Sequence, residues 1–241
     1  MTPRSRPPRG LFITLEGTEG CGKSTQAKLL GEHLRNQGYD TVETREPGGT
    51  PLAEKIRSLL LDRADEPVAP ETEAFLVFAA RRQHVAQVIE PALARGSIVL
   101  CDRFIDSTLA YQGYARGLDI ATLERLNRLA THALMPDLTL VFDLPVSTGL
   151  ARRRSAAELN RLDRESLRFH RSVRTGFLDL AKRHPTRIKV LSARASKETV
   201  ARAVARVVTP MLGHIRRGVD HNRPAASRPS PQKSQARHAI R

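Results

Sequence analysis

Short apolar runs alternate with longer amphipathic stretches along most of the chain. Several of the short runs are almost continuously apolar, which is typical of strands that are covered on both faces. We expect strands at 11–16, 40–44, 97–101, 138–144 and 187–191. The longer stretches predict helices at 23–37, 52–61, 71–94, 119–132, 146–155, 163–183 and 196–212. This alternation predicts an α/β fold with a five-stranded parallel sheet flanked by helices, and ligands at the carboxyl ends of its strands.

The two ends of the chain do not follow this pattern. Residues 1–10 are rich in Pro and Arg, and residues 214–241 combine Pro, Ser and Arg with few large apolar side chains. Such segments cannot bury enough apolar surface to offset the entropy that is lost when they become ordered. We therefore expect a disordered N-terminal extension over 1–10, a single domain over 11–213 and a disordered basic tail over 214–241.

The charge is distributed unevenly. The 241 residues carry a formal net charge of +15, which suggests a nucleic acid or an acidic membrane as partner. However, residues 1–10 hold three Arg and no acid, residues 214–241 hold seven Lys or Arg and one Asp, and residues 150–175 hold eight Arg and three acids. The rest of the chain is nearly neutral. We expect the domain itself not to bind nucleic acid, whereas the partner of the basic tail is left open.

Other features narrow the class of protein. No stretch approaches the roughly 18 apolar residues of a membrane-spanning helix, and the apolar run after the basic N-terminus is too short for a signal peptide. Cys21 and Cys101 form no C-x-x-C pair, and no H-E-x-x-H motif is present. We expect a cytoplasmic protein with no membrane association and no zinc site. Packing in the core is the simpler role for the two thiols, and a redox pair is the alternative.

The strongest motif is GTEGCGKST at 17–25, which matches G-x-x-x-x-G-K-[ST] between a predicted strand and a predicted helix. Its glycines allow a tight turn in which successive N–H groups face phosphate oxygens, and the helix N-terminus adds positive potential. Lys23 is expected to bind the β- and γ-phosphates of a nucleotide, and Ser24 to ligate Mg²⁺. The expected nucleotide-binding residues of this loop are Gly17, Thr18, Glu19, Gly20, Cys21, Gly22, Lys23, Ser24 and Thr25.

A second motif, CDRF at 101–104, directly follows a predicted strand. Asp102 at the end of that strand can hold Mg²⁺ through a water molecule, and Arg103 can bind a second phosphate. An ordinary ion pair at a strand end is the alternative for this pair. A phosphate loop alone does not distinguish an ATPase, a GTPase and a kinase, but the N-K-x-D motif that reads guanine is absent.

Four further segments, in this order along the chain, resemble bacterial thymidylate kinases of the phosphate-loop nucleoside monophosphate kinase family. They are TREPGGTPLAEKIRSLLL at 44–61, FAARRQH at 78–84, CDRF with DSTLAYQG within 101–113, and PDLTLVFDLP at 136–145. With the phosphate loop, the similarity runs from about residue 11 to residue 210. The resemblance implies the nucleoside monophosphate kinase fold, transfer of phosphate from ATP to dTMP with Mg²⁺ to give dTDP for dTTP synthesis, and a homodimer.

The resemblance also implies roles for individual residues. Glu19 would accept a hydrogen bond from the 3′-hydroxyl of the monophosphate, and Arg45 and Arg103 would bind its phosphate. The other residues expected in the acceptor pocket are Glu46, Pro47, Phe78, Arg81, Arg82, Thr108, Tyr111 and Gln112. In the usual family pattern the base-stacking Phe precedes the base-reading Arg by four residues. Phe78 precedes Arg82 by four residues, but an alignment on Gln83 and His84 favours Arg81 as the residue that reads the base. Arg81 and Arg82 therefore both stay open for this role. Phe78 can either stack on the base or belong to the core.

An arginine-rich segment stands where the family has a lid, expected here at about 150–165. Because the variable positions of the phosphate loop hold no Arg, the lid is expected to supply cations to the transferring phosphoryl group and to exclude water. Of Arg152, Arg153, Arg154 and Arg161, we favour Arg154 and Arg161 as catalytic residues, beside Lys23, Asp102 and Arg103. Solvated surface charge is the alternative for the others. Arg194 would stack on adenine.

Two other functions compete with this interpretation. One is a kinase for a different nucleoside monophosphate, which the T-R-E-P-G-G-T block disfavours. The other belongs to a different class: a phosphate-loop regulator that binds nucleic acid with its basic tails.

Overall fold

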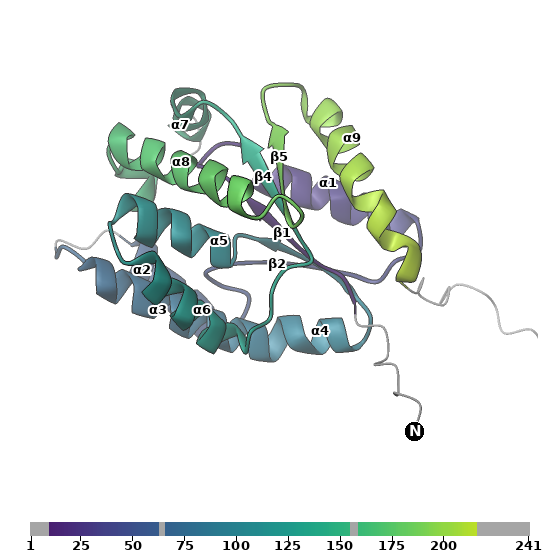
Figure 1. Cartoon of the computed structure of the whole chain (residues 1–241), viewed down its shortest axis with the longest axis horizontal. Helices are drawn as coiled ribbons and strands as arrows, with labels where there is room; N and C mark the ends of the chain where they lie inside the picture. Colours follow the sequence, from purple (N-terminus) through teal and green to yellow (C-terminus); the bar gives the residue numbers. More distant parts are fainter. Residues whose placement is uncertain (1–9, 63–65, 155–158, 216–241) are drawn as a thin grey trace, which may run out of the picture.

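The computed structural model describes residues 10–62, 66–154 and 159–215 (Figure 1). The segments predicted to be disordered lie almost entirely outside these ranges, as does part of the predicted lid, 155–158. In the part of the chain that is described, no helix is long and apolar enough to cross a membrane.

Five strands form one parallel sheet in the order β2-β3-β1-β4-β5. They span β1 Phe12–Glu16, β2 Thr41–Arg45, β3 Ile98–Asp102, β4 Leu138–Asp143 and β5 Ile188–Ser192. All of β1 is buried, and so are all residues of β3 and β4 except the last of each, as expected for strands with helices on both faces. The predicted five-stranded parallel sheet is confirmed, and every strand lies within one residue of its predicted bounds.

The helices also follow the predicted order. They span α1 Lys23–Asn36, α2 Pro51–Leu61, α3 Pro70–His84, α4 Glu90–Ala94, α5 Ile105–Thr108, α6 Ile120–Thr131, α7 Val146–Arg154, α8 Leu167–Arg183 and α9 Lys197–Val208. A π-helical turn at Val85–Ile89 (η1) joins α3 to α4, so the helix predicted over 71–94 is continuous. A second π-helical segment, η2 (Leu109–Ala115), continues α5, and the sequence pattern gave no indication of this helix.

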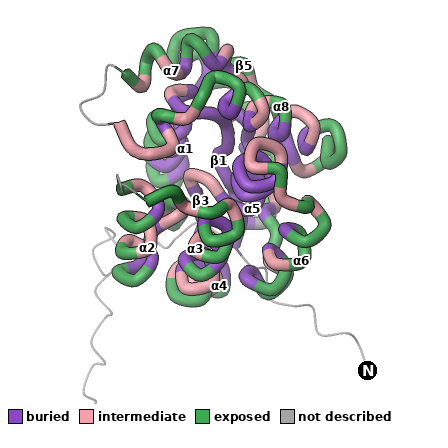
Figure 2. The backbone as a smooth tube through the Cα atoms, turned by 90° about the vertical axis from the view of Figure 1, so that its left-hand side faces the viewer, coloured by how far each residue is buried: buried purple, intermediate pink, exposed green. Residues whose placement is uncertain are grey.

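The helices form one layer on each face of the sheet (Figure 1). On one face, Ile13, Leu15 and Leu140 pack against α1 and α9. On the other face, Phe12 and Val99 pack against α4 and the segment after β3, and α3, α6 and α8 complete this layer. The split follows from the alternation of side chains along each strand. Figure 2 shows the buried residues gathered in the sheet and on the helix surfaces that face it.

The strand order brings three loops together at the carboxyl end of the sheet. Leu15 in β1 pairs with Asp102 in β3, and Asp102 pairs in turn with Arg45 in β2. The loops that follow these strands therefore meet at the carboxyl end of the sheet, where a parallel α/β fold places its ligands.

Candidate active site

The loop after β1 has the backbone of a phosphate-binding loop. Gly17, Gly20 and Gly22 adopt φ of 140°, 69° and 95°, which side chains with a Cβ rarely tolerate. Gly22 is the N-cap of α1, so the N-terminus of this 14-residue helix faces the loop. Nζ of Lys23 donates to the carbonyls of Gly17 and Thr18, both at 3.0 Å, and lies over the loop where a phosphate would be bound.

The start of α7 packs backbone to backbone against this loop. A Cβ on Gly20 would lie 2.0 Å from the carbonyl oxygen of Gly149, and a Cβ on Gly149 would lie 2.3 Å from the carbonyl oxygen of Glu19. Only two glycines permit this approach. It fixes the beginning of the arginine-rich helix directly beside the phosphate loop.

Ser24 and Asp102 meet at the mouth of the loop. The Ser24 hydroxyl donates to Oδ2 of Asp102 at 2.6 Å, which joins the first turn of α1 to the end of β3. Within the described residues, no three His, Cys, Asp or Glu side chains gather in a way that could hold a metal by themselves. One hydroxyl and one carboxylate instead suit Mg²⁺, which keeps several waters and takes its remaining oxygens from nucleotide phosphates.

Arg103 stands at the centre of the site. Its backbone φ of 73° is uncommon for a residue with a side chain and turns the chain sharply after β3. Its guanidinium donates to Oε1 of Glu19 at 3.0 Å and to the Gly17 carbonyl at 3.2 Å, and it lies 4.9 Å from the Tyr111 ring centroid. Burial disfavours its charge, but the phenol group of Tyr111 and the carboxylates of Glu19 and Asp102 outweigh burial and raise the pKa of Arg103.

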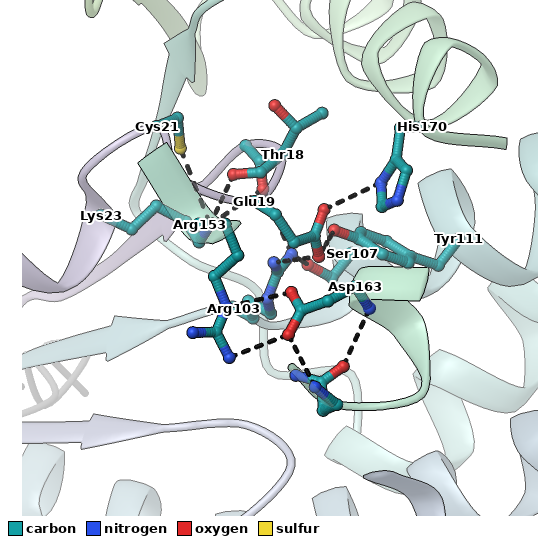
Figure 3. A network of polar contacts seen from close by, with 12 residues as sticks. Thr18, Glu19, Cys21, Lys23, Arg103, Ser107, Tyr111, Arg153, Asp163 and His170 are labelled. Carbon is teal, nitrogen blue, oxygen red and sulfur yellow. Dashed lines mark hydrogen bonds and ion pairs between the residues drawn. The ribbon is translucent and has the colours of Figure 1, made fainter. Parts of the chain in front are cut away.

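Glu19 is a buried carboxylate inside the phosphate loop (Figure 3). Its Oε1 accepts from the Tyr111 hydroxyl at 2.6 Å as well as from Arg103, and its Oε2 lies 3.2 Å from Nδ1 of His170. Burial raises the pKa of Glu19, yet Arg103, His170, Lys23 and Tyr111 together lower it below its usual range. This carboxylate is therefore ionised at any physiological pH.

A cavity of about 280 Å³ joins these groups. The phosphate loop, Asp102 and Arg103 form one wall, and residues of α2, α3 and η2 form the opposite one. The lining includes Glu19, Lys23, Ser24, Glu46, Pro47, Arg57, Val77, Asp102, Arg103, Tyr111, Gln112, Arg153 and Arg161. A second cavity of about 750 Å³ lies beyond the phosphate loop, between Lys23, Arg152 and the segment from Ala193 to Val200. The two cavities share Gly20, Lys23, Ser24 and Arg153, so two ligands can meet at the loop.

Comparison with known proteins agrees with this geometry. The family model for thymidylate kinase matches residues 15–204. A thymidylate kinase of Pseudomonas putida strain W619 is 53% identical over 206 residues, which are 86% of this chain and all of the relative. A thymidylate kinase of Thermomicrobium roseum is 55% identical over 207 residues, 86% of this chain and 98% of the relative. The crystal structure of thymidylate kinase from Ehrlichia chaffeensis superposes with a TM-score of 0.69 at 37% identity, covering 84% of this chain and 99% of the other.

The chain belongs to the thymidylate kinase family. The resemblance that the sequence motifs suggested is thus confirmed.

Of the residues that the family pattern suggested for base binding, Arg81 and Arg82 lie on different sides of α3. Arg81 is 1% exposed and donates to Glu46, Thr108, Asn127 and the Phe104 carbonyl. Arg82 donates to the Ala130 carbonyl and to Glu90, away from the cavity. Only Arg81 therefore reaches other predicted pocket residues, and it stands behind the cavity wall rather than in it.

Phe78 and Thr108 are also withdrawn from the cavity. Phe78 is buried in the core beneath α3, and the neighbouring Val77 lines the cavity instead, because successive residues point about 100° apart around a helix. This placement does not support stacking of Phe78 on a base and favours its core role. Thr108 is 1% exposed and bonded to Arg81. Tyr111, Gln112, Glu46 and Pro47 do line the cavity, as the family pattern implies.

Of the two arginines expected to bind the acceptor phosphate, Arg103 lines the cavity and Arg45 does not. The side chain of Arg45 is 54% exposed and is held by both oxygens of Glu54 outside the cavity. Arg57 lines the cavity and donates to the Pro47 carbonyl at 2.8 Å. Burial, and then the nearby charge of Arg45, lowers the pKa of Arg57. The sequence does contain a signal for Arg57. It stands four residues after Ala53 and three before Leu60, so the helical period places it on the same face of α2 as these two buried residues.

The candidate lid arginines face different cavities. Arg154, one of the two favoured residues, lines a separate cavity with Leu150 and Leu167, whereas its neighbour Arg153 lines both cavities beside the phosphate loop. Arg153 is held by Asp163 at 2.8 Å. Arg161 does line the acceptor cavity, but its guanidinium is bound to Glu73 at 2.6 Å and to the Leu60 carbonyl.

On the other side of the phosphate loop, Arg194 is exposed, and Ala193, Ala195 and Ser196 line the second cavity around it. Stacking of Arg194 on adenine stays a prediction. Cys21 and Cys101 are both buried and free.

Proposed function

We propose that this thymidylate kinase family member transfers the γ-phosphoryl group of ATP to dTMP and releases dTDP and ADP. The observation that carries the proposal is the shared wall of the two cavities. A phosphate loop with Lys23 opens into both, and Arg103 and Arg57 stand across the loop where an acceptor phosphate would be bound. A site with cations on both sides of the loop suits two phosphorylated ligands that face each other.

The residues act by positioning and by charge. The acceptor oxygen of a monophosphate is already anionic, so the reaction requires no general base. Arg103 and Arg57 would hold the acceptor phosphate, and the planar guanidinium of each can do so with two hydrogen bonds. Lys23 and Arg153, which lie between the cavities, would stabilise the negative charge of the group in transfer.

Ser24 and Asp102 would hold Mg²⁺ on the donor side, Asp102 through a water molecule. When bound, the ion would neutralise charge on the β- and γ-phosphates of ATP. Their hydrogen bond of 2.6 Å shows that a hydroxyl and a carboxylate already converge at this point.

Three kinds of contact would recognise the nucleoside. Glu19 would accept a hydrogen bond from the 3′-hydroxyl, Val77 and Tyr111 would contact the base and sugar with apolar surface, and Gln112 would offer a polar group. Gln112 is held in place by a hydrogen bond of 2.7 Å to Glu73. Arg81 would support this pocket from behind through Glu46 and Thr108.

A substrate panel tests the proposal. Purified protein with ATP and Mg²⁺ is expected to convert dTMP to dTDP with a kcat/KM at least about 100-fold above that for dCMP, dGMP or AMP. Chelation of Mg²⁺ is expected to abolish turnover, and Lys23→Ala to lower kcat by about 10³-fold, since it removes a preorganised cation. Preference for another monophosphate would show that the family assignment is right but that the acceptor is not dTMP.

We also infer a homodimer in the cytoplasm. Leu52 and Leu59 on α2, Phe75 on α3 and Leu129 on α6 are 51%, 65%, 61% and 72% exposed, and α2 and α6 both pack beside α3. Exposed apolar side chains on adjacent helices suit a self-complementary interface. The two free thiols suit a reducing compartment. Sedimentation equilibrium is expected to give twice the chain mass for the wild type and the chain mass for Leu59→Glu. The control Leu167→Glu, on α8, is expected to stay dimeric.

A further inference from the structure

His170 is a buried polar residue that the proposed mechanism does not use. It lies in the first turn of α8 and is 0% exposed. Its ring packs edge-on against Phe169 at a centroid distance of 5.6 Å. Among the described residues, neither ring nitrogen has an aligned hydrogen-bond partner. A buried imidazole without partners is unfavourable in a folded protein, so its presence at this position calls for a specific reason.

The group nearest to the ring is Glu19. Nδ1 of His170 lies 3.2 Å from Oε2 of Glu19, within ion-pair distance (Figure 3). That oxygen also lacks an aligned hydrogen bond within the described part of the chain. The other oxygen, Oε1, accepts from Tyr111 and Arg103. The two oxygens are therefore in different environments: one is fixed by two donors, and the other faces only the imidazole.

The number of acceptor positions on the carboxylate limits what it can bind. An ionised carboxylate offers about four lone-pair positions. Tyr111 and Arg103 use two of them, and a donor on His170 would use a third. The remaining position is on Oε2, which is itself buried, so a ligand hydroxyl can approach Glu19 only from the cavity side. The direction in which that side of the carboxylate faces depends on how the carboxylate plane is held. Without His170, only the two contacts of Oε1 would hold this plane, and Oε2 would be buried without a polar neighbour.

We propose that His170 is a positioning residue for the acceptor nucleoside. It orients Glu19 from α8 through the buried Oε2, so that the cavity side of the carboxylate faces the 3′-hydroxyl of dTMP. Because α8 follows the arginine-rich segment in the chain, this contact also ties the phosphate loop to the element that comes directly after that segment. The inference rests on the proposed function, and specifically on Glu19 as the acceptor for the sugar hydroxyl.

Steady-state kinetics with two acceptors test this role. The acceptors are dTMP and its 2′,3′-dideoxy analogue, which lacks the 3′-hydroxyl. His170→Phe keeps a planar ring but removes both nitrogens, and it is expected to lower kcat/KM for dTMP about tenfold. For the dideoxy analogue the same substitution is expected to change kcat/KM less than about twofold, because the hydroxyl that Glu19 would bind is missing. His170→Asn, whose amide nitrogen can stand near the position of Nδ1, is expected to recover most of the loss.

A matched control separates positioning from packing. Val173→Ala removes buried volume from the same face of α8, where Val173 is 0% exposed. It is expected to lower the thermal midpoint and to affect both acceptors by the same factor. Equal losses on both acceptors with His170→Phe, or no loss on dTMP, would overturn the proposal. If His170→Phe does not fold, the comparison between His170→Asn and His170→Ala decides in the same way. Wild-type protein that fails to phosphorylate dTMP would instead disprove the proposed function.

Discussion

Glu16 and Glu19 are three residues apart, both are buried, and their carboxyl groups behave in opposite ways. Burial, and then the nearby charge of Asp106, raises the pKa of Glu16 to about 7. The pKa of Glu19 is lowered instead, because Arg103, His170, Lys23 and Tyr111 outweigh its burial. Burial alone therefore does not determine the charge of a carboxyl group in this site. The charged and polar groups beside each carboxyl also matter: Arg103 contacts Glu19 directly, whereas the charge of Asp106 acts on Glu16.

The two side chains serve different neighbours. Glu16 ends β1 and accepts from the Phe104 backbone N–H at 2.8 Å and from the Ser107 hydroxyl at 2.6 Å, so it fastens the segment after β3. The charge of Asp106 is matched by Arg187 at 2.6 Å, and no cation is in hydrogen-bond contact with Glu16 within the described residues. Glu19 contacts Arg103 at 3.0 Å and lines the cavity. One carboxyl group holds the framework, and the other is kept ionised for a ligand.

Removal of the cation that separates the two carboxyl groups should have the largest effect. Arg103→Met is expected to lower kcat for dTMP by about 10³-fold, equivalent to about 4 kcal/mol, since the preorganised cation that would hold the acceptor phosphate is lost. The pKa of Glu19 is also expected to rise, because its nearest positive charge is gone. Kinetics at pH 7.5 measure the first effect. Arg125→Met, on the exposed side of α6, is the matched control and should stay within about twofold. A loss below tenfold for Arg103→Met would contradict the central role given to it.

The second prediction concerns the pH dependence of stability. Glu16 has a pKa of about 7 in the folded protein and about 4.5 in the unfolded chain, so the folded state retains a proton that the unfolded state releases between these values. The free energy of unfolding therefore falls as the pH rises through this window, by about 2.5 kcal/mol between pH 5 and pH 8 from this group alone. The lowered pKa of Glu19 adds no slope here, because its stabilisation is lost only at lower pH.

Glu16→Gln isolates this contribution. The amide can still accept from the Phe104 N–H but cannot ionise, so its stability relative to the wild type is expected to rise by about 2.5 kcal/mol from pH 5 to pH 8. Urea unfolding of both proteins at the two pH values measures the difference. Parallel pH profiles for the two proteins would show that Glu16 stays ionised in the folded state.

Glu19→Gln should have a smaller effect, and on a different quantity. The uncharged amide keeps the shape of the side chain but weakens its contacts with Arg103 and with a ligand hydroxyl. A charged hydrogen bond contributes about 2 kcal/mol, so kcat/KM for dTMP is expected to fall about 30-fold, with little change in the pH dependence of stability between pH 5 and pH 8. Stopped assays of dTDP formation measure the loss. An unchanged kcat/KM would exclude Glu19 from acceptor binding.

The sequence predicted the parts of this site whose signals are local. The glycines and Lys23 of the phosphate loop follow a fixed spacing, and the strands are short apolar runs that need no partner to be recognised. The segment from Ile105 to Gly113 was missed because all of its residues are buried. Its polar residues, such as Asp106, Ser107 and Thr108, are buried together with its apolar ones, so polar positions do not mark a solvent-facing side and no amphipathic period results.

The sequence also did not predict in which direction a given side chain points around its helix. Arg153 and Arg154 are adjacent and chemically identical, but on α7 they face different cavities. Which of them lines the cavities beside the phosphate loop depends on how α7 is placed, and the close contact between Gly20 and Gly149 that fixes this placement is a tertiary feature. Arg45 and Arg57 differ in the same way, since Glu54 holds Arg45 outside the cavity. The residue types and the region could be predicted, but not the side chain that points inward.

The smallest effect tests whether Ser107 acts through Glu16. Ser107 donates to Oε2 of Glu16 at 2.6 Å and accepts from Arg103 at 3.3 Å. Ser107→Ala removes a donor that favours the ionised carboxylate, so the pKa of Glu16 is expected to rise further. The loss of stability should be about 1 kcal/mol at pH 8 and less at pH 5, where Glu16 is already protonated in the folded state. Urea unfolding in the Glu16→Gln background provides the control, because the pH dependence of this loss should vanish there. A loss that is the same at both pH values in the wild-type background would mean that Ser107 acts through Arg103 and not through Glu16.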